Sequence, residues 1–118
     1  MTRKVTPRTL LIYLELSGEE PFSLWLESLS DSVQARIRQR LRRLEQGNLG
    51  DCKLLGDGVS ELRLFFGPGY RIYFGEHQNS LVILLLGGDK SSQKKDIKKA
   101  KKLWENYKER FNEDVETL

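Results

Sequence analysis

Hydrophobic and polar positions alternate along two short segments in the middle of the chain, and this alternation predicts a β-hairpin. Val59–Phe66 and Tyr70–Phe74 are rich in β-branched, aromatic and large apolar residues, and residues 67–69 between them are Gly-Pro-Gly. A three-residue loop would place Leu64 opposite Ile72. A change of loop length by one residue would mix apolar and polar side chains on each face. The pattern therefore predicts the hairpin and the direction in which each side chain points.

The two faces of this hairpin differ strongly in composition, because successive side chains of a strand point to opposite sides. The apolar face, which we expect in the core, holds Leu62, Leu64, Phe66, Tyr70, Ile72 and Phe74. The other face holds Glu61, Arg63, Phe65, Arg71, Tyr73 and Gly75. We expect this second face to lie open, either as an ordinary solvated surface or as a binding site for an anion.

Five further segments show the apolar pattern of a strand or a helix. The helical segments have apolar residues at steps of three and four, which place one stripe on one side of each helix. The predicted elements are a strand over Thr9–Leu16, helices over Pro21–Leu29 and Asp31–Glu45, a strand over Leu81–Leu86, and a helix from Ser91 or Ser92 to about Phe111.

These elements follow the order β-α-α-β-β-β-α, which predicts an α+β fold. We expect a curved antiparallel sheet with the helices packed on one face. Leu81–Leu86 is apolar on both faces, which places it in the interior of the sheet, and residues 47–58 are expected to form a loop. The sequence shows neither a repeat nor a linker. We therefore expect a single domain over 1–118, with its core over about 8–111 and a frayed tail over 112–118.

Composition argues against several classes of protein. The chain has 118 residues, of which 38% are hydrophobic and 31% charged, as expected of a soluble folded domain. Its apolar runs are shorter than the roughly 20 residues that span a bilayer, and residues 1–10 lack the pattern of a signal peptide. Cys52 and His77 are the single cysteine and histidine, so an internal disulfide and the usual zinc sites are excluded. We therefore expect a cytoplasmic protein whose chemistry needs neither metal nor cofactor.

Basic residues are concentrated in two segments, although the net charge is only +3. Local positive charge is typical of proteins that bind a polyanion or an acidic protein, although solvated helix faces show the same pattern. The arginine cluster comprises Arg36, Arg38, Arg40, Arg42 and Arg43, and the lysine cluster comprises Lys90, Lys94, Lys95, Lys98, Lys99, Lys101 and Lys102. If the polyanion is RNA, which the near absence of acidic residues from Lys90 to Lys102 favours, the candidate RNA-binding residues are Arg40, Arg43, Lys94, Lys95, Lys98 and Lys102.

The polar face of the hairpin favours a site for a phosphodiester. Lys90 follows the strand next to Arg71 and Tyr73, so these side chains can converge. Arginines grip phosphate through paired hydrogen bonds, and fixed cations stabilise the charge that develops when a 2′-hydroxyl attacks phosphorus. The candidate catalytic residues are therefore Arg63, Arg71, Tyr73 and Lys90. Each also has a structural interpretation: Arg63 can pair with Glu61, Tyr73 can be a packed aromatic residue, and Lys90 can be a turn residue.

Four motifs carry a resemblance to a known family: GNLGDCK, GVSELR, GPGYRIYF and GGDKSSQKKDI. From Pro21 to about Trp104 the chain resembles the RelE/ParE toxin superfamily and, within it, the HigB-like addiction module killer proteins. The resemblance implies the microbial RNase-like fold and a toxin of a type II toxin–antitoxin system, whose antitoxin is usually a helix-turn-helix protein. For RelE-like members it implies metal-independent cleavage of mRNA in the ribosomal A site, and hence inhibition of translation.

The resemblance extends to three of the candidate residues. Arg71 in GYRIYF matches the sheet arginine of the family, Arg63 lies where sheet lysines or arginines are found, and Lys90 matches a basic residue after the last meander strand. RelE itself uses a tyrosine in the C-terminal segment, where this chain has Asp96, so the resemblance identifies no general base. Two alternatives therefore stay open: a ParE-like DNA gyrase inhibitor without nuclease activity, and an RNA-binding module without toxicity.

Overall fold

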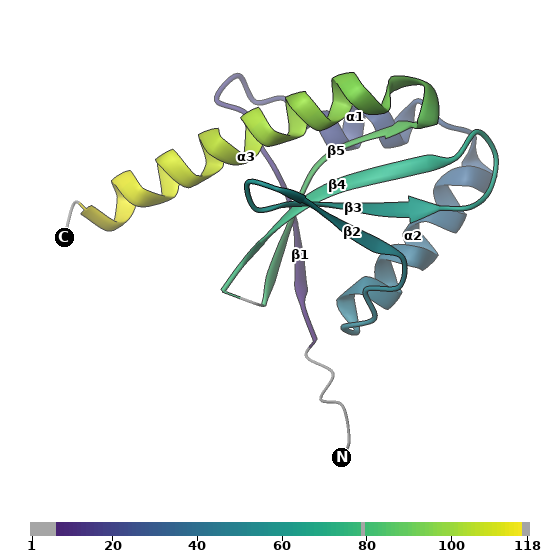
Figure 1. The fold of residues 1–118 in the computed structure, drawn as a ribbon, viewed down its shortest axis with the longest axis horizontal. Helices are drawn as coiled ribbons and strands as arrows, with labels where there is room; N and C mark the ends of the chain where they lie inside the picture. The colour runs from purple at the N-terminus through teal and green to yellow at the C-terminus, as the bar shows by residue number, and fades with distance from the viewer. Residues whose placement is uncertain (1–6, 79, 117–118) are drawn as a thin grey trace, which may run out of the picture.

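The computed structural model describes residues 7–78 and 80–116, with side chains as far as Arg110. It confirms the α+β class: an open five-stranded sheet with helices packed on it (Figure 1). Within these residues no helix is long and apolar enough to cross a membrane. The elements are β1 (Thr9–Ile12), α1 (Pro21–Glu27), α2 (Asp31–Glu45), β2 (Cys52–Gly56), β3 (Val59–Leu64), β4 (Tyr70–His77), β5 (Leu81–Asp89), the 3₁₀ turn η1 (Lys90–Ser92) and α3 (Gln93–Glu116).

The strands lie in the order β1-β5-β4-β3-β2. Three neighbouring pairs are antiparallel, whereas β1 runs parallel to β5. The sheet is therefore mixed, and the expectation of a wholly antiparallel sheet was wrong at this edge. β5 lies in the interior between β1 and β4, as its apolar residues on both faces predicted.

The β3–β4 hairpin has the predicted faces but a longer loop. Leu64 lies opposite Tyr70 instead of Ile72, so the loop comprises residues 65–69. The observed loop is two residues longer than the predicted one. Because side chains alternate with a period of two, each strand side chain remains on its predicted face. Gly67 adopts a φ of 57° in this loop, a conformation that glycine reaches without strain.

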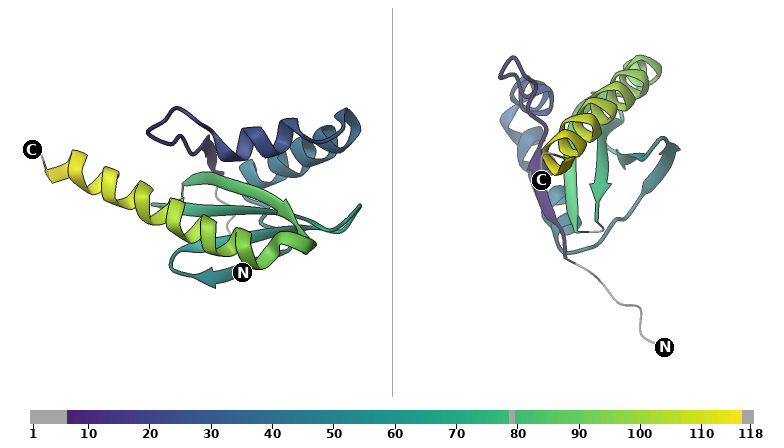
Figure 2. Two further views of the ribbon diagram at one scale, coloured as in Figure 1. Left: turned by 90° about the horizontal axis from the view of Figure 1, so that it is seen from above. Right: turned by 90° about the vertical axis from the view of Figure 1, so that its left-hand side faces the viewer.

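Helices cover both faces of the sheet, which corrects the expectation that they pack on one face (Figure 2). Helices α1 and α2 pack against the face that contains Leu62 and Phe74. Helix α3 packs against the opposite face, which contains Tyr73 and Leu85. The physical reason is that β5 is apolar on both sides and needs cover on both sides.

One strand was not predicted, and several element boundaries differ from those predicted. The expected loop contains β2, an edge strand whose side chains are mostly exposed, with Leu54 at 85% exposure, so it shows no apolar alternation. Strand β1 ends at Ile12, and Leu16, which was expected in this strand, is 90% exposed. Helix α3 continues to Glu116, while residues 117–118 of the tail expected to fray lie outside the described residues.

Two glycines within β5 let helices approach the strand closely from both sides. A Cβ atom on Gly87 would collide with the ring of Trp25 in α1, and one on Gly88 would collide with the carboxylate of Asp96 in α3. The predicted strand ended at Leu86, but β5 continues through both glycines as far as Asp89. The lack of side chains here sets the start of α3 directly on the sheet, beside the predicted polar face.

Candidate functional site

A carboxylate lies at the centre of the hairpin face that was expected to be open. The Glu61 side chain is 1% exposed, with Nε of Arg63 at 3.6 Å from its Oε1 and Nε of Arg71 at 3.8 Å from its Oε2. Nε2 of Gln93, the first residue of α3, donates a hydrogen bond of 2.9 Å to Oε2 of Glu61. Two arginines therefore share one buried carboxylate, and the start of α3 contacts the same group.

Tyr73 lies beneath α3 and is fully buried. This corrects the expectation that Tyr73 stands on an open face between Arg63 and Arg71. Burial, followed by the negative charges of Glu61 and Asp96, raises the pKa of Tyr73 well above its usual value. In this structure Tyr73 is therefore a neutral, packed aromatic side chain that is closed to solvent.

Arg71 and Lys90 meet at the hairpin loop. Nη1 of Arg71 donates a hydrogen bond of 2.7 Å to the carbonyl of Gly69, and Cβ of Lys90 lies 3.6 Å from the place that a Cβ on Gly69 would take. Arg63 lies opposite Arg71 in the β3–β4 register. Lys90 is exposed, whereas the Arg71 side chain is only 12% exposed. The structure thus brings Arg63, Arg71 and Lys90 to one end of the sheet, with Tyr73 buried behind them.

Asp89 borders this group and caps η1. Its Oδ1 accepts hydrogen bonds from the hydroxyl and the backbone N–H of Ser91, the latter at 2.8 Å. These hydrogen bonds, the one from the hydroxyl first, hold the pKa of Asp89 below its usual value. Asp89 is therefore ionised at neutral pH, and its function as a cap makes it a poor acceptor for a substrate proton.

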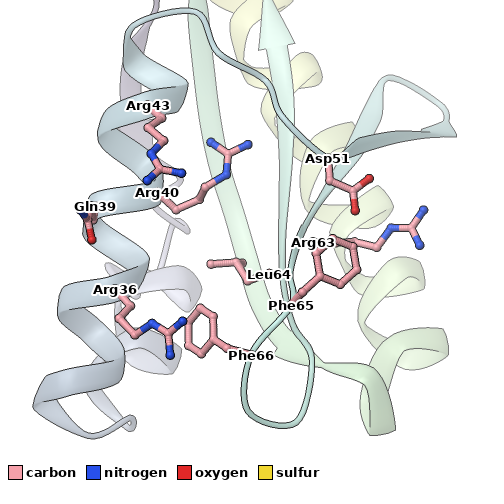
Figure 3. A pocket seen from close by; sticks show the side chains of 9 residues that line it. All are labelled: Arg36, Gln39, Arg40, Arg43, Asp51, Arg63, Leu64, Phe65 and Phe66. Carbon is pink, nitrogen blue, oxygen red and sulfur yellow. The ribbon is translucent and has the colours of Figure 1, made fainter.

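A cleft of about 280 Å³ lies between α2 and the end of β3 (Figure 3). Side chains of α2 extend towards it from one side, and the end of β3 forms the opposite rim. Its polar and aromatic lining includes Arg36, Arg40, Arg43, Asp51, Arg63 and Phe65. The cleft and the group around Arg71 share Arg63, so the two lie next to each other across the end of β3.

The arginines of α2 differ in how firmly they are held. The guanidinium of Arg36 lies over the ring of Phe66, with its Cζ 3.8 Å from the ring centroid. Nη2 of Arg40 donates a hydrogen bond of 2.6 Å to the carbonyl of Leu49, and burial lowers the pKa of Arg40. The guanidinium of Arg43 makes neither a hydrogen bond nor an ion pair with another described residue. Arg40 therefore secures the loop after α2, while Arg36 and Arg43 remain able to bind an anion.

The candidate RNA-binding residues lie on two separate surfaces. Arg40 and Arg43 line the cleft beside α2. The lysines are exposed along α3, on the opposite side of the sheet (Figure 2): Lys94, Lys95, Lys98 and Lys102. An RNA strand would have to pass round the edge of the sheet to contact both sets.

Three residues of this region were not among the candidate site residues predicted from the sequence. Glu61 was named only as a possible partner of Arg63, because its burial depends on α3. Arg36 could not be told from its neighbours in the arginine cluster. Phe65 did carry a signal: the alternation placed an aromatic residue on the polar face, and the structure leaves it 80% exposed.

Comparison with known proteins identifies the family. The sequence profile of the family described as Phage derived protein Gp49-like (DUF891) matches residues 24–108. The chain belongs to this family. The matched segment extends from α1 into α3 and contains every candidate residue described above. An uncharacterized protein of Haemophilus influenzae is 51% identical to this Gp49-like chain over 83 residues, which cover 70% of this chain and 84% of that protein.

The Gp49-like family is an addiction-module toxin family of the RelE/HigB type. Membership therefore points to the toxin of a toxin–antitoxin pair, with an antitoxin as its partner. This agrees with the resemblance found in the sequence at the level of the toxin family. The reaction of this Gp49-like chain and its cellular target have to be argued from the site.

Proposed function

We propose that this Gp49-like toxin inhibits translation in the cytoplasm by cutting mRNA on the ribosome without a metal ion. The observation that carries this proposal is the meeting of Arg71 and Lys90 at Gly69, with Arg63 opposite Arg71. Three cations at one end of a rigid sheet suit the phosphates of an RNA backbone. The antitoxin that holds the toxin inactive is, in this proposal, a helix-turn-helix protein.

The proposed reaction is transfer of a phosphodiester within the RNA strand. The 2′-oxygen of one nucleotide attacks the adjacent phosphorus, and the bond between phosphorus and the 5′-oxygen of the next nucleotide breaks. The products are a 2′,3′-cyclic phosphate and a 5′-hydroxyl. Lys90, which is exposed, donates a proton to the departing 5′-oxygen, and the proton of the 2′-hydroxyl passes to solvent or to a group of the ribosome.

Arg71 supplies fixed positive charge for this reaction. The carbonyl of Gly69 and the carboxylate of Glu61 hold its guanidinium before RNA binds. A cation that is already in place needs no reorganisation when negative charge develops on the phosphate, which is the largest single contribution to many enzymatic rate enhancements. The buried Tyr73 has no part in the proposed chemistry.

A different observation favours a second function, inhibition of DNA gyrase without nuclease activity. Tyr73 and Glu61 are buried. Asp89, which borders Arg71, is engaged by its hydrogen bonds to Ser91, so no general base beside Arg71 is evident among the described residues. In this alternative the arginines and lysines serve only to dock the toxin on its target. The two functions differ in the process that they stop.

Induction of the toxin in a bacterial host separates the two functions. Incorporation of labelled methionine, uracil and thymidine is followed in parallel. A rapid loss of methionine incorporation supports the proposed function, and a loss of thymidine incorporation supports gyrase inhibition. Unimpaired growth with soluble toxin would contradict both.

Purified toxin on mRNA-programmed ribosomes tests the role of Lys90. We expect Lys90→Ala to slow single-turnover cleavage by about 100-fold, as for the loss of a general acid, with a much smaller loss of ribosome affinity. Lys53→Ala is the matched control, because Lys53 is an exposed lysine on β2 that belongs to neither basic cluster. If Lys90→Ala lowers cleavage and affinity equally, Lys90 only anchors phosphate and is not the acid.

A further inference from the structure

Phe65 is an exposed aromatic residue at the boundary between the two basic regions. It follows the last residue of β3 and is 80% exposed, while its neighbours Leu64 and Phe66 belong to the core beneath α2 or pack against it. In Figure 3 Arg63 and Phe65 lie on the side of the cleft opposite α2, and Arg36 and Arg43 extend from that helix. Aromatic side chains beside a positively charged groove are the combination with which proteins bind single-stranded nucleic acid.

The cleft is strongly positive. Four arginines and one aspartate line it, which gives a formal charge of 4 − 1 = +3. Guanidinium groups are planar, permanently charged and suited to paired hydrogen bonds with phosphate. The cleft therefore favours a ligand that combines phosphate groups with a flat face for Phe65.

We propose that the α2 cleft is a second RNA subsite, which holds one unpaired nucleotide next to the linkage that is cut. The base of this nucleotide stacks on Phe65, and its phosphate contacts Arg36 and Arg43. The proposal rests on the proposed function for its substrate strand and adds a place where that strand is held. Because every base has a face that stacks on an aromatic ring, the subsite positions the strand without reading its sequence.

An acidic protein segment is the other class of ligand that four arginines would attract. Such a segment needs the positive charge and at most an apolar contact at Phe65, whereas a nucleotide base needs the face of an aromatic ring. Duplex RNA differs as well, since its bases already stack on one another. Variants that separate an aromatic ring from a merely apolar side chain therefore decide between these ligands.

The first test measures binding of a short fluorescein-labelled oligouridylate to purified toxin by anisotropy. We expect Phe65→Ala and Phe65→Leu each to weaken binding by about tenfold, in line with the loss of one stacked base, and Phe65→Trp to keep wild-type affinity. Leu54→Ala is the matched control, because Leu54 is equally exposed but lies on β2, outside the cleft lining. Wild-type affinity of Phe65→Leu would overturn the proposal, since the contact would then be apolar and not aromatic.

The second test measures how the same affinity depends on salt. We expect the double variant Arg36→Ala/Arg43→Ala to lower the slope by about 0.7 for each phosphate contact that is lost. The control is Arg38→Ala/Arg42→Ala, which removes two exposed arginines of the same helix that do not line the cleft. Equal effects of the two double variants would overturn the proposal, because binding would then be diffuse.

These measurements use neither ribosomes nor cleavage, so the subsite can fail independently of the proposed function. If the toxin binds the oligonucleotide through Phe65 but leaves mRNA intact on ribosomes, the subsite proposal stands and the nuclease proposal is wrong. If the Phe65→Ala toxin cuts mRNA at the wild-type rate and binds the oligonucleotide with unchanged affinity, only the subsite proposal is wrong. Release of the antitoxin by Arg36→Ala/Arg43→Ala, with oligonucleotide binding unchanged, would make the cleft a protein interface instead.

Discussion

The two faces of the central sheet are built from the same strands but are stabilised in different ways. Beneath α1 and α2, Ile72 and Phe74 pack in an apolar core. Beneath α3, apolar residues such as Leu85 share the face with the buried Glu61 and its partner Arg71. Apolar burial is non-directional and stabilises in any well-packed arrangement, whereas a buried carboxylate is tolerated only while its cations and hydrogen-bond donors are in place.

This difference separates the residues that support the fold from those proposed to act on RNA. The α1/α2 face can change composition so long as volume is kept, since it carries no charge. The α3 face holds Arg71 in place through Glu61, and loss of either group disturbs both stability and the proposed site. Four measurements test this comparison, beginning with the largest expected effect.

Truncation of the apolar face should cause the largest loss of stability. Phe74 is 1% exposed beneath α1 and α2, and Phe74→Ala should lower the free energy of unfolding by about 4 kcal/mol, through lost burial and the cavity left behind. Urea denaturation followed by circular dichroism measures this, with Leu54→Ala as an exposed control. A loss below about 1 kcal/mol, the range of ordinary surface changes, would show that this face is not the main core.

Removal of one cation from the charged face should have a smaller effect that depends on its partner. Arg71→Ala leaves the buried Glu61 with Arg63 as its cation and the Gln93 amide as its hydrogen-bond donor, and should lower the free energy of unfolding by about 2 kcal/mol. Glu61→Gln in the same chain should restore part of this, because the uncompensated charge is gone. The exposed Arg38 supplies a matched Arg38→Ala control. If the double variant is no more stable than Arg71→Ala, Arg71 does not stabilise the fold through Glu61.

The hydroxyl of Tyr73 tests whether the charged face is as closed as the structure shows. No described group lies at normal hydrogen-bond geometry from it, although the nearby Glu61 contributes to its raised pKa. Tyr73→Phe should therefore change the free energy of unfolding by at most about 1 kcal/mol. Toxicity on induction should be unchanged, since the buried hydroxyl does not reach RNA. Arg71→Lys, which keeps the charge but loses the planar fork, should reduce toxicity in the same assay. A non-toxic but stably folded Tyr73→Phe protein would show that α3 moves aside during the reaction.

The last expected effect vanishes at neutral pH and concerns the ionisation of Cys52, which packs against the α1/α2 core. Burial raises the pKa of the Cys52 thiol from 9.0 to about 11. Alkylation by iodoacetamide should therefore reach its half-maximal rate near pH 11 in the folded protein and near pH 9 in urea. Because the folded state holds this proton more tightly, the corresponding stability is present below pH 9 and is lost as the pH rises through 11. Equal profiles in the two states would mean that solvent reaches the thiol freely.

Much of the fold could be predicted because local signals were strong. The alternation in β3 and β4 identified their two faces, and the helical stripe of α2 placed Ile37 and Leu44 in the core. The signals failed where the structure depends on distant partners. Strand β2 is exposed and pairs only with β3, so its residues, such as Leu54, carry no apolar pattern. The parallel pairing of β1 with β5 likewise brings together residues that are far apart in the sequence, such as Thr9 and Leu81.

The candidate site shows the same division between features set by local sequence and features set by distant partners. The sequence by itself determined that Arg63 and Arg71 share a face and that Lys90 follows the neighbouring strand, because these relations depend only on alternation and chain order. Tertiary structure alone decided that α3 covers this face, which buries Tyr73 and Glu61, and that α2 brings Arg36 and Arg43 opposite Phe65. The physical reason is that alternation fixes the direction of a side chain, while its exposure depends on which distant helix finds enough apolar surface to pack there.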